Sequence, residues 1–230
     1  MIGLPLWLFE AGYVARLPLG GQEHKLYAGF AKHAAGVDET ADFAASRQER
    51  RREPERQKVK RLFLLRHAKA QPADGGCEDF DRTLMLSGMQ DAAAMARYLR
   101  KSDYRAELML CSSSARTTQT AELVSQELDS EIDYRDNLYL AEPAKILAAV
   151  RGAPAQVSSL MVVGHNPGLE AAAAVLAREP VRRKERARHE ALEEKFPTCA
   201  LAILDFDVGR WRDVGQGGGK LVDFVRPKDL

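Results

Sequence analysis

The sequence lacks the features that define several large protein classes. Its three cysteines, Cys77, Cys111 and Cys199, form no closely spaced pair, which argues against a disulfide scaffold and is typical of a reducing compartment. No run of about 18 apolar residues occurs, and this excludes a polytopic membrane protein. The apolar stretch at residues 4–9 is short and has no basic residue before it, unlike a secretory signal. We therefore expect a cytoplasmic protein.

An excess of charge of one sign is also missing. The 34 basic residues nearly balance the 33 acidic residues, and the formal net charge is +1. Such a chain has no global field that attracts nucleic acid or anionic lipid, so an anion site must be built locally. We expect neither nucleic acid nor a membrane among the partners of the protein, and we expect a monomer.

Common metal and nucleotide motifs are absent from the sequence. It contains no H-x-x-x-H, no C-x-x-C and no Walker loop of the form G-x-x-x-x-G-K-[ST]. The sequence thus predicts no metal site and no cofactor.

The chain divides into two parts by its hydrophobic pattern. Residues 1–57 show no sustained helix or strand period and include a charged run at 47–60, so we interpret them as a poorly patterned, flexible extension. A basic tether for a partner is the alternative interpretation. Regular patterning begins near residue 58, and residues 58–230 form the predicted domain.

Strands and helices alternate along this domain. Short apolar runs at 61–65, 107–111 and 160–163 are typical of strands that are buried on both faces of a sheet. This alternation predicts an α/β fold, a three-layer α/β/α sandwich with a central, mostly parallel sheet. Ser87 is placed to cap the first helix. The predicted helices cover 84–99, 115–128, 143–150 and 169–177, and further strands are predicted at 132–134, 198–206 and 221–225.

The segment 178–195 is dense in charge of both signs. Mixed signs at helical spacing are typical of a solvated helix with i,i+4 pairs. A lid over the substrate site is the alternative interpretation.

Polar groups follow each of the three predicted buried strands. Arg66 and His67 follow the first, Arg116 lies shortly after the second, and His165 follows the third. Ligands of open α/β sheets bind beyond the C-terminal ends of the strands, so these four side chains are expected in one crevice. Arginine offers a planar fork of donors for phosphate oxygens, and a neutral imidazole is a competent nucleophile. The pattern predicts metal-independent phosphoryl transfer through a phosphohistidine.

Three motifs in this order resemble those of the histidine phosphatase superfamily. They are LLRHAK at 64–69, CSSSARTTQTA at 111–121 and VVGHNP at 162–167. DRTL at 81–84 and FPT at 196–198 are similar to the small SixA-type phosphohistidine phosphatases, and the resemblance covers about residues 59–230. It implies a phosphoglycerate mutase-like fold.

The resemblance also implies roles for individual residues. His67 is implied as the nucleophile that becomes phosphorylated, and Arg66, Arg116 and His165 as the other side chains that bind the phosphate. Ala68 stands where the superfamily most often has glycine.

The general acid is less clear from the sequence. Asp79 and Asp81 lie near the first motif, and Glu142 lies near a position where relatives carry an acid, although Leu140 in the same stretch is apolar. A phosphoramidate substrate needs less help from an acid, because its P–N bond is labile once the nitrogen is protonated. The resemblance therefore favours protein phosphohistidine as the substrate. A small phosphomonoester is the alternative, and a non-catalytic module that binds phosphate or a phosphoprotein is an alternative of another class.

Overall fold

The computed structural model describes residues 59–73 and 76–230. The predicted extension at 1–57 lies outside these residues. Within the described part of the chain, no helix is both long and apolar enough to cross a bilayer.

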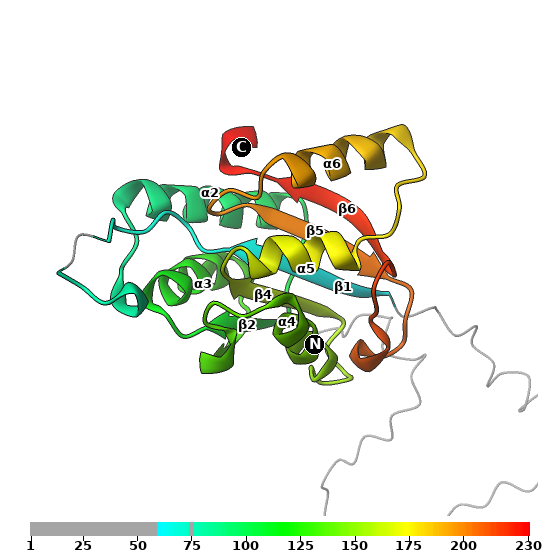
Figure 1. Cartoon of the computed structure of the whole chain (residues 1–230), viewed down its shortest axis with the longest axis horizontal. Coiled ribbons are helices and arrows are strands. Elements are labelled where there is room, and N and C mark those ends of the chain that lie inside the picture. The colour runs from blue at the N-terminus through cyan, green and yellow to red at the C-terminus, as the bar shows by residue number, and fades with distance from the viewer. Residues whose placement is uncertain (1–58, 74–75) are drawn as a thin grey trace, which may run out of the picture. The chain divides into compact units, whose positions relative to one another are not determined.

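One sheet of six strands forms the centre of the molecule, in the order β3-β2-β4-β1-β5-β6 (Figure 1). The pairs β3·β2, β2·β4 and β4·β1 are parallel, whereas β5 pairs antiparallel with both β1 and β6. The prediction of a mostly parallel sheet is thus confirmed, with an antiparallel edge. The strands are β1 (Lys60–Arg66), β2 (Leu108–Ser112), β3 (Glu131–Arg135), β4 (Ser159–Gly164), β5 (Leu201–Phe206) and β6 (Gly219–Val225).

Helices cover both faces of the sheet, as the three-layer prediction requires. Figure 1 shows α4 and α5 in front of the strands. The helices are α2 (Leu86–Lys101), α3 (Ala115–Leu128), α4 (Pro143–Arg151), α5 (Gly168–Leu176) and α6 (Arg183–Glu194). Short 3-10 turns lie at η2 (Asp79–Asp81), η3 (Asp136–Leu138), η4 (Trp211–Asp213) and η5 (Pro227–Asp229).

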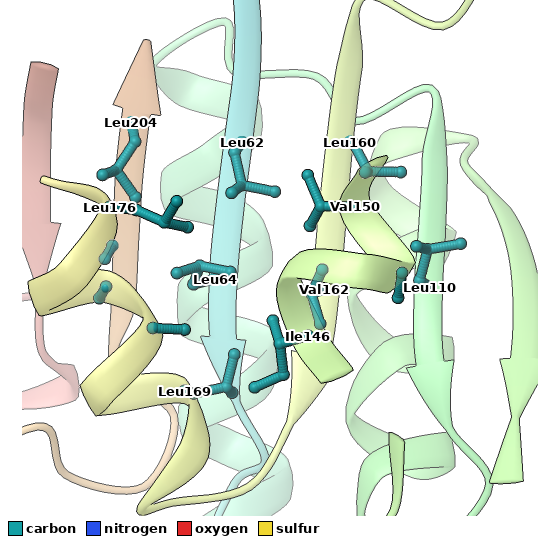
Figure 2. Close-up of a cluster of buried hydrophobic side chains, with 14 of the residues drawn as sticks. Leu62, Leu64, Leu110, Ile146, Val150, Leu160, Val162, Leu169, Leu176 and Leu204 are labelled. Carbon is teal, nitrogen blue, oxygen red and sulfur yellow. The ribbon is translucent and has the colours of Figure 1, made fainter. Parts of the chain in front are cut away.

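Alternation along the strands divides the core into two halves. Leu62 and Leu64 of β1 point to the face covered by α4 and α5 (Figure 2). Phe63 and Leu65 point to the face covered by α2 and α3. Because successive side chains of a strand point to opposite faces, a fully apolar strand must be covered on both sides. This burial holds the tip of β1 rigidly at the centre of the sheet.

The start of α2 packs against the loop that follows β1. A Cβ atom on Gly88 would lie 2.2 Å from the carbonyl oxygen of Lys69, so only glycine permits this approach. The prediction that Ser87 caps the helix is wrong, because the helix begins at Leu86 and its N-cap is Met85. The Met85 amide donates instead to the Lys69 carbonyl at 2.9 Å, which ties the helix start to the loop.

The charged segment 178–195 forms α6, and most of its side chains are exposed. Leu192 is buried and anchors the helix to the core on the α5 side of the sheet. The prediction of a solvated helix is confirmed, but its described ion pairs, such as Arg188 with Asp223, are not the predicted i,i+4 pairs. No described residue of this segment lines the pocket at the tips of β1, β2 and β4, so the structure does not support the lid interpretation.

Candidate active site

The C-terminal tips of β2, β4 and β1 lie side by side, because these three strands are parallel neighbours. Arg66 ends β1, His67 follows it, His165 follows β4, and Arg116 lies in the first turn of α3. The structure brings all four side chains to one pocket of about 470 Å³. Thr120 joins the first turn of α3 to the loop after β1. Its Oγ1 accepts a hydrogen bond from the Ala68 amide and donates one to the Arg116 carbonyl.

The ring of His67 is oriented by the backbone next to it. Its Nδ1 lies 2.8 Å from the carbonyl oxygen of Ala68, which only accepts hydrogen bonds. The proton of the neutral ring therefore lies on Nδ1, and Nε2 keeps its lone pair. Burial, aided by the cations Arg116 and Arg66, lowers the pKa of His67 to about 4. Near neutral pH this ring is a neutral nucleophile.

Arg66 is held by the backbone of Phe196. Its Nη1 donates to the carbonyl oxygen of Phe196 at 2.8 Å, and Nδ2 of Asn166 donates to the same oxygen at 3.0 Å. Its Nε is buried without a partner among the described residues. Burial lowers the pKa of this guanidinium, although an arginine remains charged. The backbone of Phe196 thus anchors Arg66, one of the cations of the pocket.

Arg116 is the more deeply buried cation, with its side chain 3% exposed. Its Nη2 donates to Oδ2 of Asp79 at 2.9 Å, and its Nη1 donates to the backbone oxygen of the same residue. The guanidinium carbon lies 5.9 Å from the ring centre of Tyr139. These contacts fix the plane of the guanidinium before any ligand binds.

His165 is almost fully buried beside this arginine. Its Nε2 lies 2.9 Å from Oγ of Ser112, its Nδ1 lies 3.4 Å from Nη2 of Arg116, and the centre of its ring lies 5.2 Å from that of His67. Burial, with further contributions from His67 and Arg116, lowers the pKa of His165 to about 3. The ring is therefore neutral near neutral pH.

Of the three proposed acids, only Asp79 lines the pocket. Its carboxylate accepts from Tyr139 at 2.6 Å, from Arg116 and from Arg82. These donors, the Tyr139 hydroxyl above all, lower its pKa to about 2, so it carries no proton to donate. Asp81 and Glu142 are exposed and do not line the pocket. Leu140, from the same stretch as Glu142, does line it and has a positive φ of 47°.

Several residues of the pocket were not assigned roles from the sequence. Lys69 and Arg82 add two cations to its lining, and Thr198 and Asn166 add polar groups. Arg82 belongs to the DRTL motif and Thr198 to the FPT motif, so the signal was present in the sequence without a role attached. The pocket combines four cations, two neutral imidazoles and one ionised carboxylate, an arrangement suited to a phosphoryl group.

Comparisons with known proteins agree with this chemistry. The model of the histidine phosphatase superfamily (branch 1) matches residues 62–139. An uncharacterized protein of Mycobacterium tuberculosis (strain ATCC 25618 / H37Rv) is 35% identical over 164 residues, which cover 71% of this chain and 100% of the relative.

Two solved structures carry the provisional name phosphohistidine phosphatase SixA. The protein from Nakamurella multipartitia has a TM-score of 0.64 and 31% identity, and the match covers 74% of this chain and 96% of that chain. The protein from Agrobacterium tumefaciens has a TM-score of 0.61 and 34% identity, with 73% of this chain and 98% of that chain covered. The motifs, the pocket and these matches together place the chain in the histidine phosphatase superfamily, as a phosphatase with a phosphoglycerate mutase-like α/β fold.

Proposed function

We propose that the protein hydrolyses phosphohistidine on a partner protein, through a phosphohistidine formed at its own His67 and without a metal ion. Arg66, Arg116 and His165 bind the phosphoryl oxygens in this proposal. The protein acts in the cytoplasm as a monomer. Because the chain is a phosphatase, the alternative of a non-catalytic binding module is set aside.

The state of Asp79 is the observation that carries the choice of substrate. A phosphomonoester leaves as an alkoxide, which needs a proton from a general acid. Asp79 is the one carboxylate among the described residues of the pocket, and three donors hold it ionised. Phosphohistidine that is protonated on its distal ring nitrogen leaves as a neutral imidazole and needs no such acid.

The proposed reaction has two displacements at phosphorus. Nε2 of His67 attacks, the P–N bond of the substrate breaks, and its electron pair returns to the substrate ring. In the phosphorylated His67 the proton stays on Nδ1, which donates to the Ala68 carbonyl, and this maintains the protonated and therefore labile form of the phosphohistidine. Water then attacks the phosphorus, the electron pair of the P–Nε2 bond returns to His67, and inorganic phosphate takes up the proton of water.

The surroundings of the pocket favour a substrate on a protein surface. Leu140 is 56% exposed at the pocket, and Phe80, 37% exposed, packs its ring against Tyr139 at 5.0 Å. Apolar side chains beside a charged pocket suit contact with the surface around a phosphorylated side chain.

A substrate panel tests this proposal. Purified protein is assayed with EDTA on a phosphohistidine protein, on p-nitrophenyl phosphate and on sugar phosphates. We expect kcat/KM to be highest for the phosphohistidine protein and unaffected by EDTA. Preference for a small phosphomonoester would instead support the alternative substrate class, and loss of activity in EDTA would contradict the metal-independent mechanism.

A further inference from the structure

A buried serine that does not line the pocket contacts the edge of the His165 ring. Ser112 ends β2 and is fully buried, and its Oγ lies 2.9 Å from Nε2 of His165. Among the described residues, this imidazole nitrogen is the only hydrogen-bond partner of the Ser112 hydroxyl. The other ring nitrogen, Nδ1, lies on the side of Arg116 and the pocket.

A neutral imidazole presents one donor and one acceptor, and its partners decide which nitrogen carries the proton. The unprotonated oxygens of a phosphoryl group only accept hydrogen bonds. His165 can therefore hold a phosphoryl group only if its proton lies on Nδ1, and in that tautomer Nε2 needs a donor. The Ser112 hydroxyl is the donor within reach.

On the pocket side, Nδ1 faces a second donor. Nη2 of Arg116 always donates, and it lies 3.4 Å from Nδ1 in hydrogen-bond geometry, so in the unliganded pocket Nδ1 can accept a long hydrogen bond from the arginine. An N–H on Nδ1 and the N–H of Arg116 would be two neighbouring donors without an acceptor between them. A phosphoryl oxygen supplies that acceptor and satisfies both.

We propose that Ser112 is a positioning residue, whose hydroxyl donates to Nε2 of His165 when a phosphoryl group is bound and so holds the proton of the neutral ring on Nδ1, facing that group. His165 then binds phosphate without first becoming an imidazolium. The strongly lowered pKa of His165 agrees with this role, because the ring does not gain a second proton near neutral pH. The charged and titratable groups that face it are Arg66, His67, Asp79, Arg116 and Tyr139.

This inference rests on the proposed function only in the placement of the phosphoryl group, and it does not depend on the leaving group. Vanadate is therefore the probe. Inhibition of the full-length protein by vanadate is measured for the wild type and for three single variants, from about pH 6 to about pH 8, the range in which an ordinary histidine titrates.

The serine run supplies matched controls for Ser112→Ala. Ser114→Ala removes a second fully buried hydroxyl, which is hydrogen-bonded to Thr117 at 2.7 Å rather than to His165. Ser113→Ala removes a hydroxyl that bonds to Asp136, away from the pocket. Both controls are expected to keep the wild-type dependence of inhibition on pH, even if Ser114→Ala lowers Tm.

For Ser112→Ala we expect vanadate to bind on the order of 10-fold more weakly near neutral pH, as for a lost hydrogen bond in a charged site. The ratio of wild-type to variant affinity should stay the same across this pH range, because the His165 ring remains neutral in both proteins. Because both proteins meet the same vanadate species at each pH, the titration of vanadate itself cancels in this ratio. A ratio that falls toward one as the pH falls would show that His165 binds vanadate as an imidazolium, and this result, or a variant equal to Ser113→Ala, would overturn the inference.

Nitrogen-15 NMR of the histidine rings tests the wild type directly and does not require the variant to fold. In the vanadate complex, His165 should show a protonated Nδ1 and an unprotonated, hydrogen-bonded Nε2. A protonated Nε2 in this complex would overturn the role of Ser112. Failure of vanadate to compete with substrate in the wild type would instead overturn the proposed phosphoryl pocket, and with it this inference.

Discussion

The hydroxyl of Tyr139 donates a 2.6 Å hydrogen bond to Oδ2 of Asp79. The same oxygen also accepts from Arg116 at 2.9 Å, so one carboxylate oxygen joins the tyrosine to a cation of the pocket. Hydrogen bonds to the charged form favour ionisation, and the pKa of Asp79 falls to about 2. The residue thus helps to orient Arg116 and is unsuited to donate a proton.

Asp79→Asn tests this assignment. Asparagine keeps an acceptor oxygen for Arg116 and removes the titrating carboxylate. We expect kcat on a sugar phosphate, whose alkoxide leaving group needs a proton, to fall by less than about 10-fold, whereas loss of a general acid costs about 10²–10⁴-fold. A larger loss, accompanied by a change in the basic limb of the pH–rate profile, would show that Asp79 is the acid.

His67→Ala should abolish turnover, because it removes the proposed nucleophile. In the wild type, brief mixing with substrate and an alkaline quench should trap acid-labile phosphate on His67. His189→Ala in α6 is the control, since His189 lies in a different pocket, and it should keep full activity. Label on a cysteine or serine would contradict the mechanism.

Replacement of Arg66 or Arg116 by alanine should lower kcat/KM by about 10²–10³-fold, the cost of removing a preorganised donor to a developing charge. Arg116→Lys should recover little of the loss, because an ammonium lacks the planar fork. Arg210→Ala, which removes an exposed ion pair with Asp213, is the control and should leave the kinetics unchanged. Wild-type kinetics in Arg116→Ala would exclude this residue from phosphate binding.

Acid should destabilise the fold before any carboxylate of the pocket protonates. The pKa values of His67 and His165 are lowered from 6.5 to about 4 and about 3. As the pH falls below about 6.5, the unfolded chain binds protons at both histidines and the folded chain does not, so stability is lost with falling pH in this window. We expect Tm to drop from about pH 7 to about pH 5.

His165→Gln should show a smaller drop in Tm over the same range, because one of the two titrating groups is gone. The comparison is made within each variant between the two pH values, which removes any constant effect of the substitution on Tm. An equal drop in both proteins would indicate that His165 titrates normally in the folded state.

A chain that begins at about Gln57 should fold and keep most of its activity on a small substrate, because the predicted domain covers 58–230. The M. tuberculosis relative aligns over its whole length to 71% of this chain. Thermal unfolding of both lengths, side by side, is the measurement. A Tm that is more than about 10 °C lower in the shorter chain exceeds the shift expected from losing about 1–2 kcal/mol of stability. Such a loss would show that the N-terminal segment is part of the fold.

The strand runs and the polar residues after them were sufficient to predict the architecture and the convergence of four side chains. That success has a physical basis, because a strand buried on both faces must be continuously apolar and parallel neighbours end at one edge. The direction of β5 and β6 was not predictable in the same way. A short apolar run specifies burial, and only its pairing with β1 decides whether it runs antiparallel.

The chain by itself determined which chemical groups are present and that they gather at the strand tips. Only the tertiary structure decided the ionisation and the tautomer of these groups. Tyr139 reaches Asp79, and His165 reaches Ser112, across 60 and 53 positions of the chain, so no local pattern records either contact. Ionisation and tautomer depend on burial and on such distant donors. For that reason the acid that the sequence left open is an ionised carboxylate in the fold, and an unremarkable serine lies against the histidine proposed to bind phosphate.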